Sequence, residues 1–567
     1  MGLQSWQSVA SPRGTLLSAR HSPGALALGL IIVFLGFRLV LAATLGFGVD
    51  ESYAVANARE LSLSYFDHPP LHYWIAHAFM PLLGDGHALR LPFIILFAGS
   101  SWLLYLLTRR LYGAWAGVWA VLALNLSAFF TLSAGGWIVP DGALFFFLLA
   151  AALTLANAFF PAAAPVSPWR TWTLAGVFIG LASLSKYQAV LFGLGLLLYL
   201  ASVRERRRVL LHPAPWAGAL ITLAIFSPVL IWNAQHGWVS FAYQGGRGLA
   251  QGGLHVGNAL ANAAGQAVWI LPWIFVPLAI AVWQALRTGR RQERSWYCLC
   301  LGLPTIAFFT INPLWGDRGL PHWPMSGWLM LYPVLGAYLD GLVAAKQTAP
   351  RSWAIASAAL LLALAAIAVG HAATGYGKLL LPAAFAHGDP TLEAVEWGPL
   401  RAELKARGYL DRNDMFVIAP NWMDAGRIDQ ALDGALPVTV FGDLTEAKNF
   451  EFRYDPKSLL GRDALIIGRA ITPDRLARLR PFFQSVEELP PMSFGRSGMQ
   501  EIELHAMLAK KLKTPLPSYD AKRAGKALPV ACGRSSRPTL IDSGGAAMLR
   551  RPMARGRPAA IRRCIGA

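Results

Sequence analysis

Residues 24–51 read GALALGLIIVFLGFRLVLAATLGFGVDE, an apolar run that ends just before Asp50 and Glu51. Residues 24–46 of this stretch are long enough to cross a bilayer core, which needs roughly 20 apolar residues. The run is longer than the apolar part of a signal peptide, and an unusually long polar segment precedes it. The sequence therefore predicts an uncleaved membrane anchor at this end of the chain.

The composition extends this conclusion to the whole protein. Of the 567 residues, 55% are hydrophobic and 14% are charged, with a mean hydropathy of +0.43. A soluble globular domain carries about 25% charged residues, because its surface needs them. The composition excludes a soluble enzyme, a coiled coil and a disordered protein. We expect a mostly α, polytopic membrane bundle.

Eleven apolar stretches have the length of a membrane span. They are residues 24–46, 91–108, 113–132, 140–160, 171–186, 188–203, 213–232, 266–286, 296–312, 324–344 and 353–373. With a cytoplasmic segment 1–23, eleven spans put every Lys and Arg cluster on the cytoplasmic side, as the positive-inside rule requires. The clusters are Arg13 and Arg20; Arg109 and Arg110; Arg170; Arg204, Arg206, Arg207 and Arg208; Arg287, Arg290, Arg291 and Arg294; Lys346 and Arg351. We expect the first external loop, 47–90, on the outer side of the membrane.

The chain after the multi-span part, 24–373, divides into two segments. Residues 374–515 contain strand-like runs at 415–419, 437–441 and 464–467, separated by helical patterns, which predicts a small external α/β domain with a partly parallel sheet. Residues 516–567 form a basic tail without apolar periodicity, so disorder is expected. The rest of the chain lacks a basic groove interleaved with aromatic residues, which argues against nucleic-acid binding.

Ionisable residues gather on the predicted outer face, from five separate loops. Charged groups at the edge of a low-dielectric slab are usually paired or functional. The candidates are Asp50, Glu51, Asp67 and His68 in the first loop, Asp141, Lys186, Arg247 and His322. Two have simple structural alternatives, because Glu51 could cap the helix that follows it and His68 precedes two prolines in a turn. For Asp50, Asp141 and Lys186 such alternatives are weaker, since each interrupts or adjoins a long apolar run.

Three motifs occur in an order that is familiar. They are DESY…ARELSLSYFDHPPLHYW in the first loop, GGWIVPD at 135–141 and GLASLSKYQ at 180–188. Over residues 24–345 the chain resembles the GT-C glycosyltransferases, and within them the bacterial branch of protein O-mannosyltransferase-like enzymes and lipid A aminoarabinose transferases. The resemblance implies a multi-span inverting transferase of the bacterial inner membrane, which takes a sugar from a polyprenyl-phosphate carrier on the periplasmic side.

The resemblance also implies roles for particular residues. Asp50 matches the acidic catalytic position of the family's first loop, and Asp141 matches a second carboxylate of the site. Lys186 matches a basic residue near the donor phosphate. Asp67 matches an acidic position before Pro-Pro, but His68 stands where the lipid A branch more often has Lys. His322 stands at a position that is typically aromatic there, so its role is open.

The chemistry of the expected reaction fits these residue types. A sugar linked through phosphate already has a stabilised leaving group, so the reaction needs a base for the acceptor hydroxyl, and we assign this role to Asp50. Fixed cations stabilise the departing phosphate, with Lys186 and Arg247 as candidates. A divalent metal near Asp67 and a histidine is conceivable, although no ligand spacing demands one. The expected partners are a polyprenyl-phosphate-linked sugar, a lipid or glycan acceptor and membrane lipids.

Other functions remain open at this point. A lipid or sugar transporter without chemistry would place its polar groups near the bilayer midplane, often within inverted repeats, and the sequence shows neither. The chain could also be an assembly partner whose outer domain binds a polysaccharide or a protein. Within the enzyme hypothesis we favour a cell-envelope glycolipid such as lipid A as acceptor, with a protein hydroxyl as the alternative.

Overall fold

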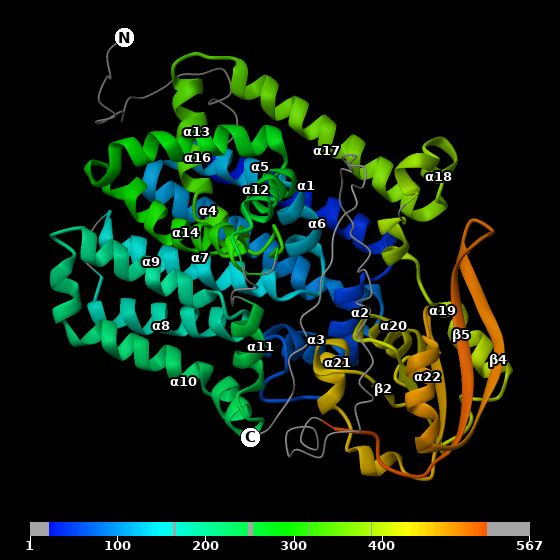
Figure 1. Cartoon of the computed structure of the whole chain (residues 1–567). Helices are drawn as coiled ribbons and strands as arrows, with labels where there is room; N and C mark the ends of the chain where they lie inside the picture. The colour runs from blue at the N-terminus through cyan, green and yellow to red at the C-terminus, as the bar shows by residue number, and fades with distance from the viewer. Residues whose placement is uncertain (1–21, 163–165, 248–252, 317, 387, 519–567) are drawn as a thin grey trace, which may run out of the picture.

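The computed structural model describes residues 22–162, 166–247, 253–316, 318–386 and 388–518. In this part of the chain a bundle of long helices is joined to a smaller domain with a five-stranded sheet. Figure 1 shows the sheet domain at one end of the bundle, beside α2 and α3. The predicted fold class, a mostly α membrane bundle with a small C-terminal α/β domain, is confirmed. The expected segment 1–23 and tail 516–567 lie almost entirely outside the described residues.

Seven helical segments of the described chain are long and apolar enough to cross a membrane. Proline stands in the first turn of several of them, as at Pro140 and Pro213, because a residue there needs no N–H for the helix. The segments are built from α1 (Pro23–Thr44), α4 (Leu91–Tyr112) with the short η1 (His87–Arg90), α7 (Pro140–Phe159), α10 (Pro213–Gln235), α14 (Glu293–Ile311), α15 and α16 (Met325–Leu329 and Tyr332–Ala344), and α17 (Ala349–Thr374).

Two more apolar segments are sharply bent. Helices α5 (Ala114–Asn125) and α6 (Ala128–Gly136) meet at 77°, and α12 (Val256–Ile270) meets the segment that begins with α13 (Pro272–Thr288) at 108°. The second bend lies inside the predicted span 266–286. Leu271 there has a φ of +80°, and Pro272 cannot continue the hydrogen bonding of α12. If each bent pair counts as one span, the described residues contain nine.

The two remaining predicted spans, 171–186 and 188–203, are also helical. They correspond to α8 (Pro168–Ser185) and α9 (Ala189–Ser202). Helix α9 has 14 residues, which is shorter than a bilayer core needs. Helices therefore lie at all eleven predicted positions, and seven to nine of them have the length and hydropathy of a span.

The basic ends of several helices meet at the end of the bundle away from the first loop. Arg206 Nε lies 2.8 Å from Glu293 Oε1, Arg290 donates to the Ser202 carbonyl at 3.1 Å, and Arg294 donates to the Leu111 carbonyl at 2.9 Å. Leu111 is at the C-terminal end of α4, whereas the first loop precedes the N-terminal end of that helix. The arginines that follow α9 and α13 are thus separated from the first loop by the length of the bundle.

The first loop forms two short helices, α2 (Val49–Ala58) and α3 (Leu71–Leu83). Every residue of helix α2 except Asp50 is buried. Helix α3 buries Tyr73 and Ala76, and it also exposes the apolar side chains of Phe79 and Leu82. Another short helix, α11 (Val239–Arg247), follows α10.

The C-terminal domain combines a sheet with several short helices. Strands β2 (Val438–Val440), β1 (Met415–Ala419) and β3 (Asp463–Gly468) are parallel and lie at the three predicted strand positions. A long antiparallel hairpin, β4 (Phe483–Arg496) and β5 (Met499–Leu512), joins β3 through β5 and was not expected. The strand order is β2-β1-β3-β5-β4. The helices are α18 (Gly377–Leu380), α19 (Gly398–Ala406), α20 (Trp422–Leu432), α21 (Leu444–Ala447) and α22 (Pro473–Leu479).

The two parts share a hydrophobic core. Tyr53 and Val55 of α2 are buried in one cluster with Val417 of β1 and Ile428 of α20. Helix α20 packs directly on α2, because a Cβ added to Gly426 would lie 2.8 Å from the Tyr53 backbone nitrogen. The C-terminal domain is therefore fixed against the first loop.

Candidate active site

Candidate residues from separate segments meet at one end of the bundle. Asp50 lies in the first turn of α2, Asp141 lies in the first turn of α7, and Lys186 directly follows α8. Asp50 is within electrostatic reach of both Asp67 and Lys186. The first loop, α7 and α8 thus bring Asp50, Asp67, Asp141 and Lys186 close together at this end of the bundle.

Asp50 presents its carboxylate to this site. Its side chain is exposed, unlike the rest of α2. The protein around the carboxylate nevertheless desolvates it, which raises the pKa of Asp50 above its usual value of 3.8. Lys448 and Lys186 oppose this increase, while Asp67 and Glu51 add to it. A reachable carboxylate with a raised pKa is suited to accept a proton.

Glu51 has a different environment. Its carboxylate is 1% exposed and forms a two-point ion pair with Arg90, with N–O distances of 2.8 and 2.6 Å. It also accepts hydrogen bonds from the backbone N–H groups of Ile138 and Gly48. These contacts fit the capping alternative, and they tie α2 to η1 and to the segment before α7. Glu51 therefore holds the neighbouring Asp50 in place and is too enclosed to meet a substrate.

Asp67 is buried and held from several directions. Its carboxylate accepts a hydrogen bond from the Tyr53 hydroxyl at 2.9 Å and lies 3.4 Å from Lys448 Nζ. Its backbone carbonyl accepts from Gln244 Nε2 of α11 at 2.7 Å. Burial would raise the pKa of Asp67, but Lys448, His68 and the Tyr53 hydroxyl together bring it below the usual value. Asp67 is therefore a permanent negative charge beside Asp50.

Two histidines of the first loop, His68 and His72, are neutral at neutral pH. Desolvation lowers the pKa of His68 to about 4, with Lys186 and Lys448 adding to the effect and Asp67 opposing it. Desolvation also lowers the pKa of His72, whose ring lies 5.8 Å from that of His68. His68 can therefore donate or accept a hydrogen bond, but it does not replace the charge of a lysine.

Asp141 and Lys186 form an ion pair across the α7–α8 contact. Lys186 Nζ lies 2.9 Å from both carboxylate oxygens of Asp141, and both side chains are largely buried. The adjacent Ser185 hydroxyl donates to the Pro140 carbonyl at 2.6 Å, which fixes the end of α8 against the start of α7. The pair is thus held rigidly at the edge of the bundle.

In the part of the chain that the structure describes, the predicted site residues Arg247 and His322 are not seen in contact with the group around Asp50. Arg247 ends α11, and its side chain lies outside the described residues. The His322 ring stacks on Phe129, with ring centroids 5.8 Å apart, and lies edge-on to Trp269 at 6.2 Å. His322 therefore packs among aromatic side chains of α6 and α12.

Lys448 is a site residue that the sequence did not reveal. It belongs to the C-terminal domain, where it follows α21 in the unremarkable stretch LTEAKNF. Its ammonium lies 3.3 Å from the ring centroid of Trp422 and 5.3 Å from that of Tyr53, besides its contact with Asp67. No local pattern marks such a residue, because only the docking of the domain brings it to the first loop.

The described residues do not contain a group of three or more His, Cys, Asp or Glu side chains arranged to hold a metal ion. Asp67, the acidic residue considered for this role, already uses its oxygens on Tyr53 and Lys448. The residues present do not fit a metal centre, and we derive no step that involves one.

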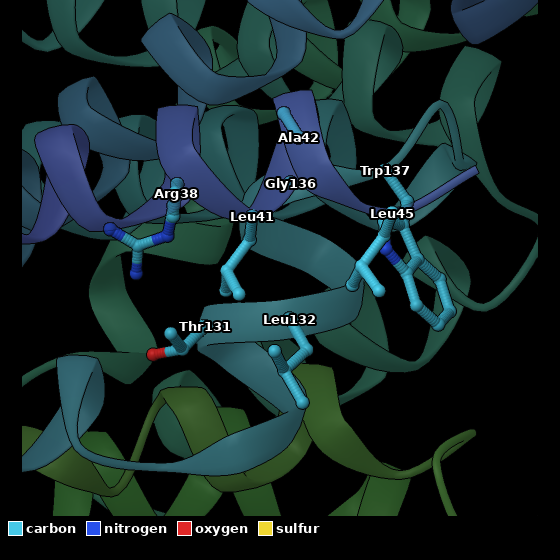
Figure 2. A pocket seen from close by; sticks show the side chains of 8 residues that line it. All are labelled: Arg38, Leu41, Ala42, Leu45, Thr131, Leu132, Gly136 and Trp137. Carbon is cyan, nitrogen blue, oxygen red and sulfur yellow. The ribbon is translucent and has the colours of Figure 1, made fainter. Parts of the chain in front are cut away.

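A crevice between α1 and α6 is distinct from this site. Figure 2 shows the polar groups of Arg38 and Thr131 toward one end of it and Leu45 and Trp137 toward the other. Arg38 donates to Asn125 Oδ1 at 2.7 Å, which links α1 to α5. Its other lining residues are Leu41, Ala42, Leu132 and Gly136, so none of the predicted site residues borders it.

Comparisons with known proteins agree with the resemblance seen in the sequence. A family model described as dolichyl-phosphate-mannose-protein mannosyltransferase matches residues 67–232. The chain is 29% identical over 308 residues to the lipid A galacturonosyltransferase RgtD of Rhizobium johnstonii. That match covers 50% of this chain and 60% of the relative, so the chain spans less than two thirds of it.

The fold has a solved counterpart. The structure of ArnT from Cupriavidus metallidurans bound to undecaprenyl phosphate matches with a TM-score of 0.58 and 16% identity, over 85% of this chain and 98% of ArnT. The apo structure of ArnT matches with a TM-score of 0.57. At this identity the likeness concerns the fold, and it includes the C-terminal domain as well as the bundle. Sequence and fold together identify the chain as a relative of the GT-C membrane glycosyltransferases.

Proposed function

We propose that the protein is an inverting glycosyltransferase that moves a sugar from a polyprenyl-phosphate carrier to a cell-envelope acceptor. The observation that carries this proposal is the exposed Asp50 carboxylate in a site that also contains Lys186, Asp67 and Asp141. A general base beside fixed cations is what sugar transfer from a phosphate requires. The glycosyltransferase relatives support the same reaction class.

In this mechanism Asp50 takes the proton of the acceptor hydroxyl. The acceptor oxygen then attacks the anomeric carbon from the side opposite the phosphate, so that the C–O bond to the sugar forms as the bond to the phosphate breaks and the anomeric configuration inverts. The electron pair of the broken bond leaves with the carrier phosphate. Because that phosphate is already a stable anion, no acid is needed to protonate it.

Lys186 is our candidate for binding the departing phosphate. An ammonium group has three N–H donors, so the contacts with the two Asp141 oxygens leave capacity for a phosphate oxygen. Asp141 keeps the ammonium fixed in place, which avoids reorganisation as charge develops. Arg247 is a second candidate cation, on the basis of its sequence position. His68 would contribute a hydrogen bond to the same region.

The site is proposed to face the periplasm. The arginines in the last turn of α4 and those that follow α9 and α13 lie at the opposite end of the bundle, and such clusters favour the cytoplasmic side. The relative RgtD acts on lipid A, and the ArnT structure contains undecaprenyl phosphate. We therefore favour an undecaprenyl-phosphate-linked sugar as donor and a glycolipid such as lipid A as acceptor, with a protein hydroxyl as the alternative.

Mass spectrometry of envelope lipids and glycoproteins tests this proposal. A strain that lacks the gene is complemented with the wild-type protein, with Asp50→Asn, or with Asp474→Asn as a control on the surface of the C-terminal domain. We expect a sugar-bearing lipid to disappear in the deletion strain and in Asp50→Asn, and to return with the wild type and the control. Loss of a sugar from a protein instead would identify the alternative acceptor.

A purified assay separates enzyme from transporter. The full chain in lipid vesicles is given undecaprenyl-phosphate-linked galacturonic acid as the donor probe and lipid A as the acceptor probe. Replacing Asp50 by Asn should lower turnover by about 100- to 10,000-fold, the usual contribution of a general base. Near-normal turnover by Asp50→Asn, at equal abundance in the membrane, would refute its role as base.

A further inference from the structure

We propose that Lys448 is a positioning residue of the active site, through which the C-terminal domain completes the site instead of serving as an accessory module. The inference rests on the proposed role of Asp50 as the base. It assigns to the domain a function that neither the family model, which ends at residue 232, nor the motifs of the sequence include.

The residue after Lys448 fixes the domain to the first loop. Asn449 is buried, and its side-chain amide donates to Asn57 Oδ1 of α2 at 2.7 Å. Its Oδ1 accepts from the Phe66 N–H at 3.1 Å, and its own N–H donates to the Tyr53 hydroxyl at 3.0 Å. These three hydrogen bonds determine where the neighbouring Lys448 side chain enters the site.

The backbone at Lys448 is held in an unusual conformation. Its φ is +47°, in the left-handed region that favours glycine. A lysine adopts such a conformation when the surrounding contacts compensate for it, and positions of this kind concentrate at functional sites. Here the compensating contacts are those of Asn449 and the packing of the lysine side chain over the Trp422 ring.

The ammonium of Lys448 lies among acidic groups. Its side chain is 15% exposed, and Nζ lies 3.4 Å from Asp67 Oδ2. The charged groups that act on Asp50 are Lys448, Asp67, Lys186 and Glu51, and Lys448 has the largest influence of these. Glu393, an exposed residue of the C-terminal domain, is also within electrostatic reach of Asp50.

The other cations near Asp50 are already engaged. Lys186 is paired with Asp141, and Arg90 is paired with Glu51. Lys448 therefore supplies the larger share of the positive charge that keeps Asp50 and Asp67 ionised side by side, and Lys186 supplies a smaller share. Without it the two carboxylates would repel each other, and neighbouring like charges raise the pKa of the more accessible group.

The test compares Lys448→Gln with Lys448→Arg in the full-length protein. The first variant removes the charge at similar length and the second keeps it. Lys457→Gln is the matched control, because Lys457 is an exposed lysine of the same domain. The profile of kcat/KM against pH is measured with undecaprenyl-phosphate-linked galacturonic acid and lipid A as probes.

We expect Lys448→Gln to move the acidic limb of this profile to higher pH by about one unit. This is the lower end of the pKa shift that a neighbouring charge causes. At pH values well below the limb, kcat/KM of Lys448→Gln is then about tenfold lower than that of the wild type. At high pH it recovers toward the wild-type value. Lys448→Arg and Lys457→Gln should keep the wild-type profile. A role limited to domain docking would instead lower kcat/KM equally at every pH.

Several outcomes would overturn the inference. One is an unshifted limb in Lys448→Gln; another is an equal loss at every pH together with a lower unfolding midpoint. If Asp50→Asn is inactive while Lys448→Gln behaves as the wild type, only the role of Lys448 is refuted. If Asp50→Asn itself is fully active, the proposed function fails first.

Discussion

Replacing Lys186 by Met should separate the structural role of the Asp141–Lys186 pair from its proposed chemical role. The two side chains are 11% and 7% exposed, with N–O distances of 2.9 Å. Water can therefore do little to solvate the carboxylate that loses its partner. Removing one member of a buried pair costs about 3–5 kcal/mol, and because both groups retain slight exposure we expect about 3 kcal/mol.

The assay is equilibrium unfolding in mixed detergent, applied to Lys186→Met, Asp141→Asn and the double variant. The two residues are in contact, so their effects should not add. In the double variant neither group is left as an unpaired buried charge, and most of the lost stability should return. A single Lys186→Met variant within 1 kcal/mol of the wild type would refute this account of the pair.

The same variants test whether Lys186 binds the phosphate of the donor. If Lys186 binds it, the double variant regains stability but not affinity, since a hydrogen bond to a charged group contributes about 1.5–3 kcal/mol. That loss corresponds to roughly a 10- to 100-fold higher KM for the donor. A stable double variant with an unchanged donor KM would show that the ion pair is purely structural.

Three further predictions concern other contacts of the site. The rate should fall as the pH is lowered through the raised pKa of Asp50, because protonation removes the base. The pH profile of kcat/KM checks this prediction, and an acidic limb below pH 3.8 would contradict it. His68, with a pKa of about 4, should produce no limb near its usual value of 6.5, and its replacement by Gln should leave that region of the profile flat. Replacing Arg90 by Met leaves the buried Glu51 unpaired and should lower the free energy of unfolding by about 3–5 kcal/mol, with partial recovery when Glu51→Gln is added.

The sequence predicted the bundle well because a bilayer imposes simple local rules. An apolar run of the right length becomes a helix wherever it occurs, since lipid offers no other partner for backbone N–H and C=O groups. Asp50, Asp141 and Lys186 each adjoin such a run, so hydropathy alone placed them at helix ends. The three parallel strands of the C-terminal domain were likewise visible as short apolar runs.

Local sequence patterns did not predict the features of the structure that depend on tertiary packing. The strands of the β4–β5 hairpin are defined by pairing with each other and with β3. The bend at Leu271 interrupts a stretch whose hydropathy is continuous. Whether Glu51 caps a helix or meets a substrate depended on Arg90, a residue 39 positions away.

Hydropathy and the positions of charged residues, which are properties of short segments, thus predicted the helical bundle and several of the residues that gather at one end of it. The composition of the site itself was decided only by tertiary structure. Lys448 reaches Asp67 because Gly426 lets α20 lie directly on α2 and because Asn449 bonds to Asn57. Such contacts join residues almost 400 positions apart, and they arise from the fit of two surfaces, which no period or spacing within either segment encodes.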